Sequence, residues 1–237
     1  MSLPFFYINS LDNTATSFVL NEDTSRHVVQ VLRMQLGEQL LLTDGKGHVI
    51  TAMISDDHKK RCVVQQLSAS YIPPAEKKIT IAISLLKNAA RFEWFLEKAT
   101  EIGVTEIIPL LCARTAKEHF RTERMNGILV SAMLQSKQAW LPLLHEPVAI
   151  SRYFQQSASN QDQIRKFIAH CEEDAIKTSL TSVSQKSTSV ILIGPEGDFT
   201  QEEINHAIVQ GYTPVSLGDT RLRTETAGIV AAVQLKG

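Results

Sequence analysis

The stretch SVILIGPEGDFTQEEINHAIVQGYTPVSLGDTRLRTETAGIVAAV, residues 189–233, decides the fold of this chain. It holds two short apolar runs, at 190–193 and 214–217, each of a length that suits a buried strand. Each run ends in glycine and leads into a segment with helical periodicity, which is typical of a parallel sheet in an α/β protein. In such sheets ligands bind beyond the carboxyl ends of the strands, so we expect the turns at 194–198 and 218–225 to face one crevice.

The first of these turns reads Gly194-Pro195-Glu196-Gly197-Asp198. Two glycines let the backbone come close to a ligand and the proline stiffens the turn, although an ordinary strand-to-helix connection is the alternative. The phosphate-binding patterns G-x-x-x-x-G-K-[ST] and G-x-G-x-x-G are absent. A carboxylate here would repel a phosphate, whereas S-adenosylmethionine has an adenosine, a positive sulfonium and no phosphate. The turn therefore favours an uncharged or cationic ligand of that kind.

A helix is expected directly after this turn, at residues 201–209. Thr200 and Glu203 form the pattern of a capping box, in which each side chain accepts a hydrogen bond from a backbone N–H at the helix start. The helical period then turns Ile204 and Ile208 inward. Capping alone explains Thr200 and Glu203, so neither is a candidate for chemistry.

The second turn carries Arg221, Arg223 and Glu225 at the start of a helix whose residues 227–233 are nearly all small or β-branched. This composition predicts a helix that is buried on all sides. Charged groups at the start of a buried helix are costly unless they are paired or bind something. One interpretation is an internal arginine–glutamate pair that fixes the turn. The other is an arginine that faces a substrate that is, or becomes, anionic.

The composition of the 237 residues, 43% hydrophobic and 21% charged, is that of an ordinary soluble globular protein with one large domain or two modest ones. No apolar run approaches the roughly 20 residues of a membrane helix, and residues 1–10 lack the features of a signal peptide. Cys62, Cys112 and Cys171 are odd in number and far apart, so we expect reduced thiols in a cytoplasmic protein without a metal site. Because the net charge is −1, any RNA partner must be bound by local basic patches.

The run His170-Cys171-Glu172-Glu173 could be mistaken for a catalytic or metal-binding cluster. Successive residues at a strand end point to alternate faces, so these side chains cannot all converge. Serine-protease, cysteine-nucleophile and paired-carboxylate hydrolase sites have little support in the chain.

Residues 1–72 predict a small, strand-rich unit in which short strands surround one helix, as in a small barrel. The strands are expected at 39–43, 48–54 and 62–67. The helix should carry Val28, Val31 and Leu32 on one face. Basic residues on or beside this helix and in the loop before the last strand form either a solvated surface or an RNA-contacting one: Arg26, His27, Arg33, Lys59, Lys60 and Arg61.

Paired prolines, Pro73 and Pro74, mark the boundary to a second domain at residues 73–237. From residue 79 onward, strand-like and helix-like segments alternate, which is typical of an α/β fold with a parallel sheet. The expected strands include 79–86, 104–111 and 166–171, the expected helices include 91–103 and 122–139, and polar surface segments are expected at 151–163 and 181–189.

Two runs, IGPEGDFT at 193–200 and LGDTRLRTETA at 217–227, resemble the paired C-terminal signatures of the RsmE family. These proteins are bacterial methyltransferases of the SPOUT superfamily that use S-adenosylmethionine to modify N3 of a uridine in 16S ribosomal RNA. The similarity covers essentially the whole chain, through RHVVQVLRM at 26–34, DGKG at 44–47, RFEWFLEKATEIGV at 91–104, Arg114 and Gln135-Ser136.

The resemblance implies a PUA-like, RNA-binding β-barrel over residues 1–72 and a SPOUT α/β domain over 73–237 with a C-terminal trefoil knot, in a homodimer. The implied site for S-adenosylmethionine comprises His170, Ile193, Gly194, Pro195, Glu196, Gly197, Leu217, Gly218, Leu222 and Arg223. The implied contacts with 16S rRNA in the small ribosomal subunit are made by Arg26, Arg33, Lys59, Lys60, Arg61, Arg114 and Gln135.

Two positions depart from the usual pattern of the family. Asp198 stands where a second glycine is frequent, at the lip of the expected pocket. Gln138 stands where an arginine is frequent, and Lys137 is the basic residue beside it. These departures concern contacts with the cofactor and with RNA more than they concern the reaction.

N3 of uracil must lose its proton before it can accept a methyl group, so the implied reaction needs a group that stabilises the uracil anion. Arg223 is the candidate for that role, Glu225 is the candidate for orienting it, and either is a candidate to assist removal of the proton. Two other interpretations remain open. One is a SPOUT methyltransferase that acts on another RNA nucleotide, and the other is a non-catalytic ribosome-assembly protein that binds RNA.

Overall fold

The computed structural model describes residues 3–9, 11, 15–116, 120–157, 164–172, 177–182 and 187–237. The chain divides into two compact units. The first comprises Met1–Pro74 and Met133–Leu141, and the second comprises Ala75–Ala132 and Pro142–Gly237. Residues 133–141, which the sequence assigns to the second domain, therefore pack with the first unit.

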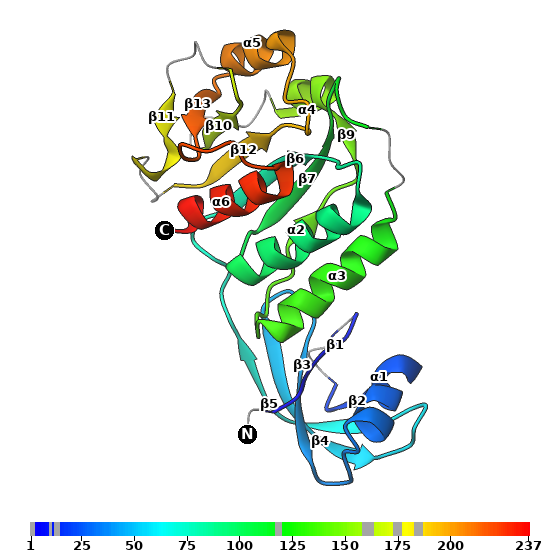
Figure 1. Cartoon of the computed structure of the whole chain (residues 1–237). Coiled ribbons are helices and arrows are strands. Elements are labelled where there is room, and N and C mark those ends of the chain that lie inside the picture. The colour runs from blue at the N-terminus through cyan, green and yellow to red at the C-terminus, as the bar shows by residue number, and fades with distance from the viewer. Residues whose placement is uncertain are drawn as a thin grey trace. The chain divides into compact units, whose positions relative to one another are not determined.

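The first unit is built on one five-stranded sheet in the order β1-β3-β4-β5-β2, coloured blue to cyan in Figure 1. β1 and β3 are parallel, and the other neighbours are antiparallel. Alternating apolar side chains of β3 and β4, including Leu40, Leu42 and Ile50, fill its core. The strands are β1 (Phe5–Tyr7), β2 (Ser17–Val19), β3 (Gln39–Thr43), β4 (His48–Asp56) and β5 (Val63–Tyr71).

The helical segment of this unit differs from its prediction. An α-helical turn, α1 (Glu22–Arg26), continues into a π-helical turn, η1 (His27–Val31). Val28 is buried as expected, but Val31 is 67% exposed and Leu32 is also exposed. The wider turn, in which the N–H of Leu32 bonds the carbonyl of His27, shifts side chains that α-helical spacing would stack on one face.

The second unit is an α/β layer structure whose main sheet has the order β11-β13-β10-β12-β6-β7-β8, with β9 paired to β7. The described strand pairs in it are parallel, which confirms the predicted α/β class. Its strands are β6 (Ile79–Ser84), β7 (Glu106–Leu111), β8 (Leu143–Leu144), β9 (Val148–Ala149), β10 (Arg165–Ala169), β11 (Thr178–Ser179), β12 (Ser189–Ile193) and β13 (Thr213–Ser216). Its helices are α2 (Ala89–Ile102), α3 (Thr122–Gln135, which extends into the residues of the first unit), α4 (Ile150–Ser157), η2 (Leu180–Ser182), α5 (Gln201–Val209) and α6 (Thr224–Lys236).

Helices α2 and α6 lie side by side on one face of this sheet (Figure 1). α2 begins at the N-cap Asn88 and ends at Gly103, whose φ of 91° is the left-handed conformation expected of a C-terminal glycine. α6 comes close because Gly228 has no side chain. A Cβ there would lie 2.6 Å from Cε2 of Phe95 and 2.9 Å from Cδ1 of Ile83. The final helix is therefore fitted against α2 and β6 by a glycine.

Three predictions about exposure in this unit are wrong. Residues 151–157 of the segment predicted as a polar excursion at 151–163 belong to α4, which buries Tyr153 and Phe154 against Tyr212 because the two aromatics lie on its inner face. The rest of that segment, 158–163, lies outside the described residues. In α5, Ile208 is exposed, since the helix packs against the core only through its other face. In α6, Val233 is 53% exposed, because in the single chain this helix has one uncovered face.

The capping box at the start of α5 is confirmed. Oγ1 of Thr200 accepts the N–H of Glu203, and Oε2 of Glu203 accepts the N–H of Thr200. The other carboxylate oxygen of Glu203 accepts the N–H of Ala113 at 2.8 Å, so this side chain also ties the loop after β7 to α5. The trefoil knot implied by the resemblance stays a prediction.

Candidate active site

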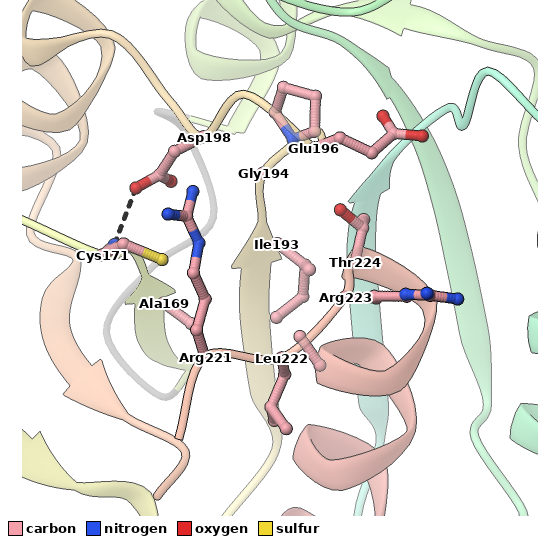
Figure 2. Close-up of a pocket in the computed structure, with 12 residues that line it drawn as sticks. Ala169, Cys171, Ile193, Gly194, Glu196, Asp198, Arg221, Leu222, Arg223 and Thr224 are labelled. Atoms are coloured by element: carbon pink, nitrogen blue, oxygen red, sulfur yellow. Dashed lines mark hydrogen bonds between the residues drawn. The ribbon is translucent and has the colours of Figure 1, made fainter. Parts of the chain in front are cut away.

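The turns that follow β12 and β13 meet at the carboxyl end of the parallel sheet. β10 lies between these two strands and pairs with both, so three strand ends come together. They enclose a cavity of about 360 Å³, called cavity 1 (Figure 2). Its walls are Ala169, Cys171, Ile193, Gly194, Pro195, Glu196, Asp198, Arg221, Leu222, Arg223, Thr224 and Ala227.

A second cavity of about 350 Å³, called cavity 2, adjoins the first and shares five of its lining residues. Its other walls are His170, Lys177 and residues 215–220, which form the end of β13 and the turn beyond it. Each cavity is of the size that proteins use for small organic ligands. The shared residues are Ala169, Cys171, Arg221, Leu222 and Ala227.

Asp198 joins the turn after β12 to the end of β10. Its Oδ2 accepts the N–H of Cys171 at 2.7 Å, a contact drawn in Figure 2, and its Oδ1 accepts the N–H of Phe199 at 2.8 Å. The residue has a φ of 63°, a left-handed conformation in which glycine is usual and aspartate is tolerated. Where the resemblance leads one to expect glycine, this chain therefore has a carboxylate that fastens two walls of the cavity together.

Arg114, predicted as an RNA contact, is bonded to the same turn. Its Nη1 donates to the carbonyl oxygens of Gly197 at 2.7 Å and Phe199 at 3.3 Å. A Cβ on Gly197 would lie 3.4 Å from Cδ of Arg114, so the arginine runs along the outer side of the turn. The residue is exposed, but its guanidinium is already engaged in holding the backbone that carries Glu196.

The two arginines of the second turn point in different directions (Figure 2). Arg221 extends toward Asp198 and Cys171, whereas Arg223 extends away from them, toward the side where the Glu196 carboxylate lies. On a regular extended strand two side chains at i and i+2 would share a face, so their different directions show that the backbone leaves that regular form as it passes into α6 at its N-cap, Arg223.

Glu225 does not pair with either arginine of its own turn. Its Oε1 lies 3.7 Å from Nε of Arg91 in α2, and its buried Oε2 has no hydrogen-bond partner among the described residues. The internal arginine–glutamate pair that the sequence suggested exists, but its arginine comes from a different helix. Glu225 is absent from the residues that line either cavity and lies in the first turn of α6.

His170 forms a buried wall of cavity 2 and is only 8% exposed. Neither ring nitrogen has a hydrogen-bond partner in the described ranges. Burial, with a smaller contribution from the charge of Lys177, lowers the pKa of His170 below its usual value, so the ring is neutral near pH 7. A neutral imidazole offers one donor and one acceptor to a ligand in this cavity.

The residues predicted to bind S-adenosylmethionine divide between the two cavities. Ile193, Gly194, Pro195, Glu196, Leu222 and Arg223 line cavity 1, while His170, Leu217, Gly218 and again Leu222 line cavity 2. Gly197 lines neither and lies against Arg114. The sequence did not single out Cys171, Lys177 or Thr224 as ligand contacts, although the position of Cys171 at the carboxyl end of an expected strand was a usable signal.

The remaining predicted RNA contacts lie in the first unit and are exposed: Arg26, Arg33, Lys59, Lys60, Arg61 and Gln135. Glu22 links helix α1 to the loop between β4 and β5 that contains Lys59, Lys60 and Arg61. Its Oε1 forms ion pairs with Arg26 and, at 3.7 Å, with Lys60. Arg33 has a φ of 56°, so the chain turns sharply there. The basic residues of helix and loop therefore occupy one local surface.

Within the described ranges, no three His, Cys, Asp or Glu residues converge in a way that could hold a metal ion. In the same ranges every helix is too short or too polar to cross a membrane.

Two family models match the chain. Residues 73–236 match an RNA methyltransferase domain, and residues 20–67 match an RNA methyltransferase PUA domain. Among the relatives, the ribosomal RNA small subunit methyltransferase E of Synechocystis sp. is 31% identical over 212 residues, which cover 88% of this chain and 69% of the relative.

Two solved structures show the same architecture. A probable rRNA-methyltransferase from Porphyromonas gingivalis superposes with a TM-score of 0.89 at 36% identity, covering 97% of this chain and 95% of that one. The ribosomal RNA small subunit methyltransferase E of Neisseria gonorrhoeae, bound to S-adenosyl methionine, superposes with a TM-score of 0.85 at 28% identity, covering 98% and 95%. This chain therefore belongs to the RNA methyltransferase family that includes the ribosomal RNA small subunit methyltransferases E.

Proposed function

We propose that this protein transfers a methyl group from S-adenosylmethionine to N3 of a uridine in 16S ribosomal RNA, on the small ribosomal subunit. The observation that carries the proposal is the meeting of the two turns around adjoining cavities that hold apolar, carboxylate and arginine side chains. The relatives that share this architecture are rRNA methyltransferases by name, and one of them was solved with S-adenosyl methionine.

The residues present fit this cofactor. Ile193 and Leu222 supply apolar contacts, and the backbone at Gly218 has open space beside it for close approach by a ligand. His170 has ring nitrogens that lack a partner among the described residues and line the same space. When bound, S-adenosylmethionine supplies a methyl group on a positively charged sulfur, which suits a cavity lined by carboxylates.

The chain's own contribution to the reaction is to orient the uracil and to stabilise its anion. Arg223 lines cavity 1, and its assigned role is to stabilise the uracil anion. The negative charge of that anion spreads over O2, N3 and O4 when N3 loses its proton. Arginine stays protonated and is a poor base. Glu196, on the same side of the cavity in Figure 2, is the carboxylate placed to accept that proton. Glu225, held by Arg91, fixes the turn that carries Arg223.

RNA binding is assigned to the basic surface of the first unit, with Arg26, Arg33 and the loop Lys59–Lys60–Arg61. Contacts of this kind neutralise phosphates and position the RNA, while the reacting base must leave its stack to enter the site. Within the proposal the protein is a cytoplasmic homodimer with a C-terminal trefoil knot. The uncovered face of α6, where Val233 is half exposed, supports a second copy as its partner.

The test is incubation of the protein with methyl-labelled S-adenosylmethionine and unmodified small ribosomal subunits, beside naked 16S rRNA, followed by nucleoside mass spectrometry. Label in 3-methyluridine is expected. Label in another nucleoside would show that the proposed substrate is wrong while the fold assignment stands. The protein would then be a methyltransferase that acts on a different nucleotide. Absence of both label and cofactor binding would favour a non-catalytic ribosome-assembly protein.

The role of Arg223 is tested by Arg223→Ala in the same assay. Turnover should fall by about 100-fold or more, because removal of a preorganised charge costs about that much. Binding of the cofactor, measured by calorimetry, should change far less. Arg152, an exposed arginine of α4, provides the matched control Arg152→Ala, which should leave both quantities unchanged. Near-normal turnover of Arg223→Ala would remove Arg223 from the catalytic role.

A further inference from the structure

Arg221 occupies the border between cavities 1 and 2, since it lines both. It is an exposed residue whose side chain rises from the turn before α6 toward Asp198 (Figure 2). No hydrogen bond or salt bridge engages its guanidinium within the part of the chain that the structure describes. A guanidinium has five N–H donors, so an arginine in this state is ready to bind an anion.

The other cations around the cavities are already directed elsewhere. Arg114 donates to the backbone of the turn after β12. Lys177 donates from Nζ to the carbonyl oxygen of Glu172. Arg223 points away from the border between the cavities (Figure 2). Arg221 is therefore the cation that faces a ligand lying across both cavities.

Asp198 keeps the guanidinium of Arg221 in this region while leaving its N–H groups available to a ligand. Both carboxylate oxygens of Asp198 accept backbone N–H groups, from Phe199 and Cys171, so the carboxylate is fixed in place. Its negative charge attracts Arg221 across the lip of cavity 1, and the charges of both residues act on the thiol of Cys171 beside them. The arginine is thus held near a fixed carboxylate while its N–H groups stay available.

We propose that Arg221 binds the carboxylate of the amino-acid part of S-adenosylmethionine. The inference rests on the proposed function, because it takes that cofactor as the ligand. An adenosine suits cavity 2, which Leu217 and Gly218 line and which has open space beside Gly218, and the reacting methyl group must face Arg223 in cavity 1. The amino-acid part then lies near the border of the two cavities. A planar guanidinium matches a carboxylate there through two parallel hydrogen bonds.

The experiment compares S-adenosylmethionine with decarboxylated S-adenosylmethionine, which lacks only the carboxylate, by calorimetry on the full-length protein. The unaltered protein should bind S-adenosylmethionine at least about tenfold more tightly, as expected for a charge-assisted hydrogen bond at an exposed site. Arg221→Met should remove that preference, so that the two ligands bind with about equal affinity, and should change the affinity for the decarboxylated ligand little. Arg221→Lys should retain part of the preference, and the control Arg152→Met should retain all of it.

Different failures point to different errors. If Arg221→Met lowers the affinity for both ligands equally, Arg221 supports the structure of the pocket in general and the proposal is wrong. If affinity for both ligands is unchanged while methylation of RNA is lost, Arg221 contacts RNA instead and the proposal is equally wrong. If the unaltered protein binds neither ligand, the cofactor assignment itself fails. Melting temperatures of the variants, expected to equal that of the unaltered protein, separate these results from misfolding.

Discussion

The Nη1 atom of Arg114 lies 2.7 Å from the carbonyl oxygen of Gly197, 83 residues further along the chain. This hydrogen bond connects the loop after β7 to the turn after β12, which forms one wall of cavity 1. A second contact from the same nitrogen, to the carbonyl of Phe199 at 3.3 Å, spans the turn. The residue that the sequence associated with RNA therefore also shapes the candidate cofactor site.

Arg114→Ala should loosen this turn and weaken binding of S-adenosylmethionine by about tenfold, which corresponds to about 1.4 kcal/mol. The physical reason is the loss of a charged donor from two backbone carbonyls. Calorimetry measures the effect. Arg124→Ala is the control, because Arg124 pairs with Glu93 and lines neither cavity. Unchanged cofactor affinity together with weaker RNA binding would assign Arg114 to RNA alone.

Gly228→Ala should destabilise the protein by about 1–3 kcal/mol, because the new methyl group would overlap Phe95 and Ile83. Gly127→Ala is the matched control. Gly127 lies within α3, and a Cβ there would meet nothing within 4 Å, so this change should stabilise the protein by up to about 1 kcal/mol. Urea unfolding of both variants gives the comparison. Equal stabilities would show that α6 does not pack on α2 through Gly228.

Arg91→Met should destabilise the protein by about 1–3 kcal/mol, because it leaves the buried carboxylate of Glu225 without its ion-pair partner. The double variant Arg91→Met with Glu225→Gln should recover part of this loss, since a neutral amide tolerates burial better. A double-mutant cycle by urea unfolding measures the coupling, expected at about 0.5–3 kcal/mol. Strict additivity of the two single changes would mean that the pair contributes nothing.

His170 should make the folded state sensitive to mild acid. Burial lowers its pKa below the usual value of 6.5, so below that pH the unfolded chain takes up a proton more readily than the folded chain does. Its contribution to stability is therefore fully present above pH 6.5 and is lost as the pH falls toward the lowered pKa.

Melting temperatures between pH 8 and pH 5 test this expectation. The unaltered protein should lose more stability over that range than His170→Gln, which cannot titrate. Identical pH profiles would show that His170 keeps an ordinary pKa in the folded protein.

Local patterns were sufficient for the elements that contain them. The runs at 190–193 and 79–86 contain buried strands, Thr200 and Glu203 cap α5, and Gly103 ends α2 with a positive φ. Each depends on contacts within a few residues, which a short stretch of sequence contains. The same local reasoning failed where the backbone left the ideal period, as in the π-helical turn that exposes Val31.

The sequence by itself determined the α/β class, the two glycine-bounded turns at the strand ends, and the charged and apolar residues that the site would have available. Only the tertiary structure decided that Glu225 pairs with Arg91 in another helix and that Arg221 and Arg223 point in different directions. It also decided that Asp198 fastens the turn to Cys171. The reason is physical: strand and helix propensities act over a few neighbouring residues. The partners of a charged side chain depend instead on which distant segments the strand order brings to the same edge of the sheet.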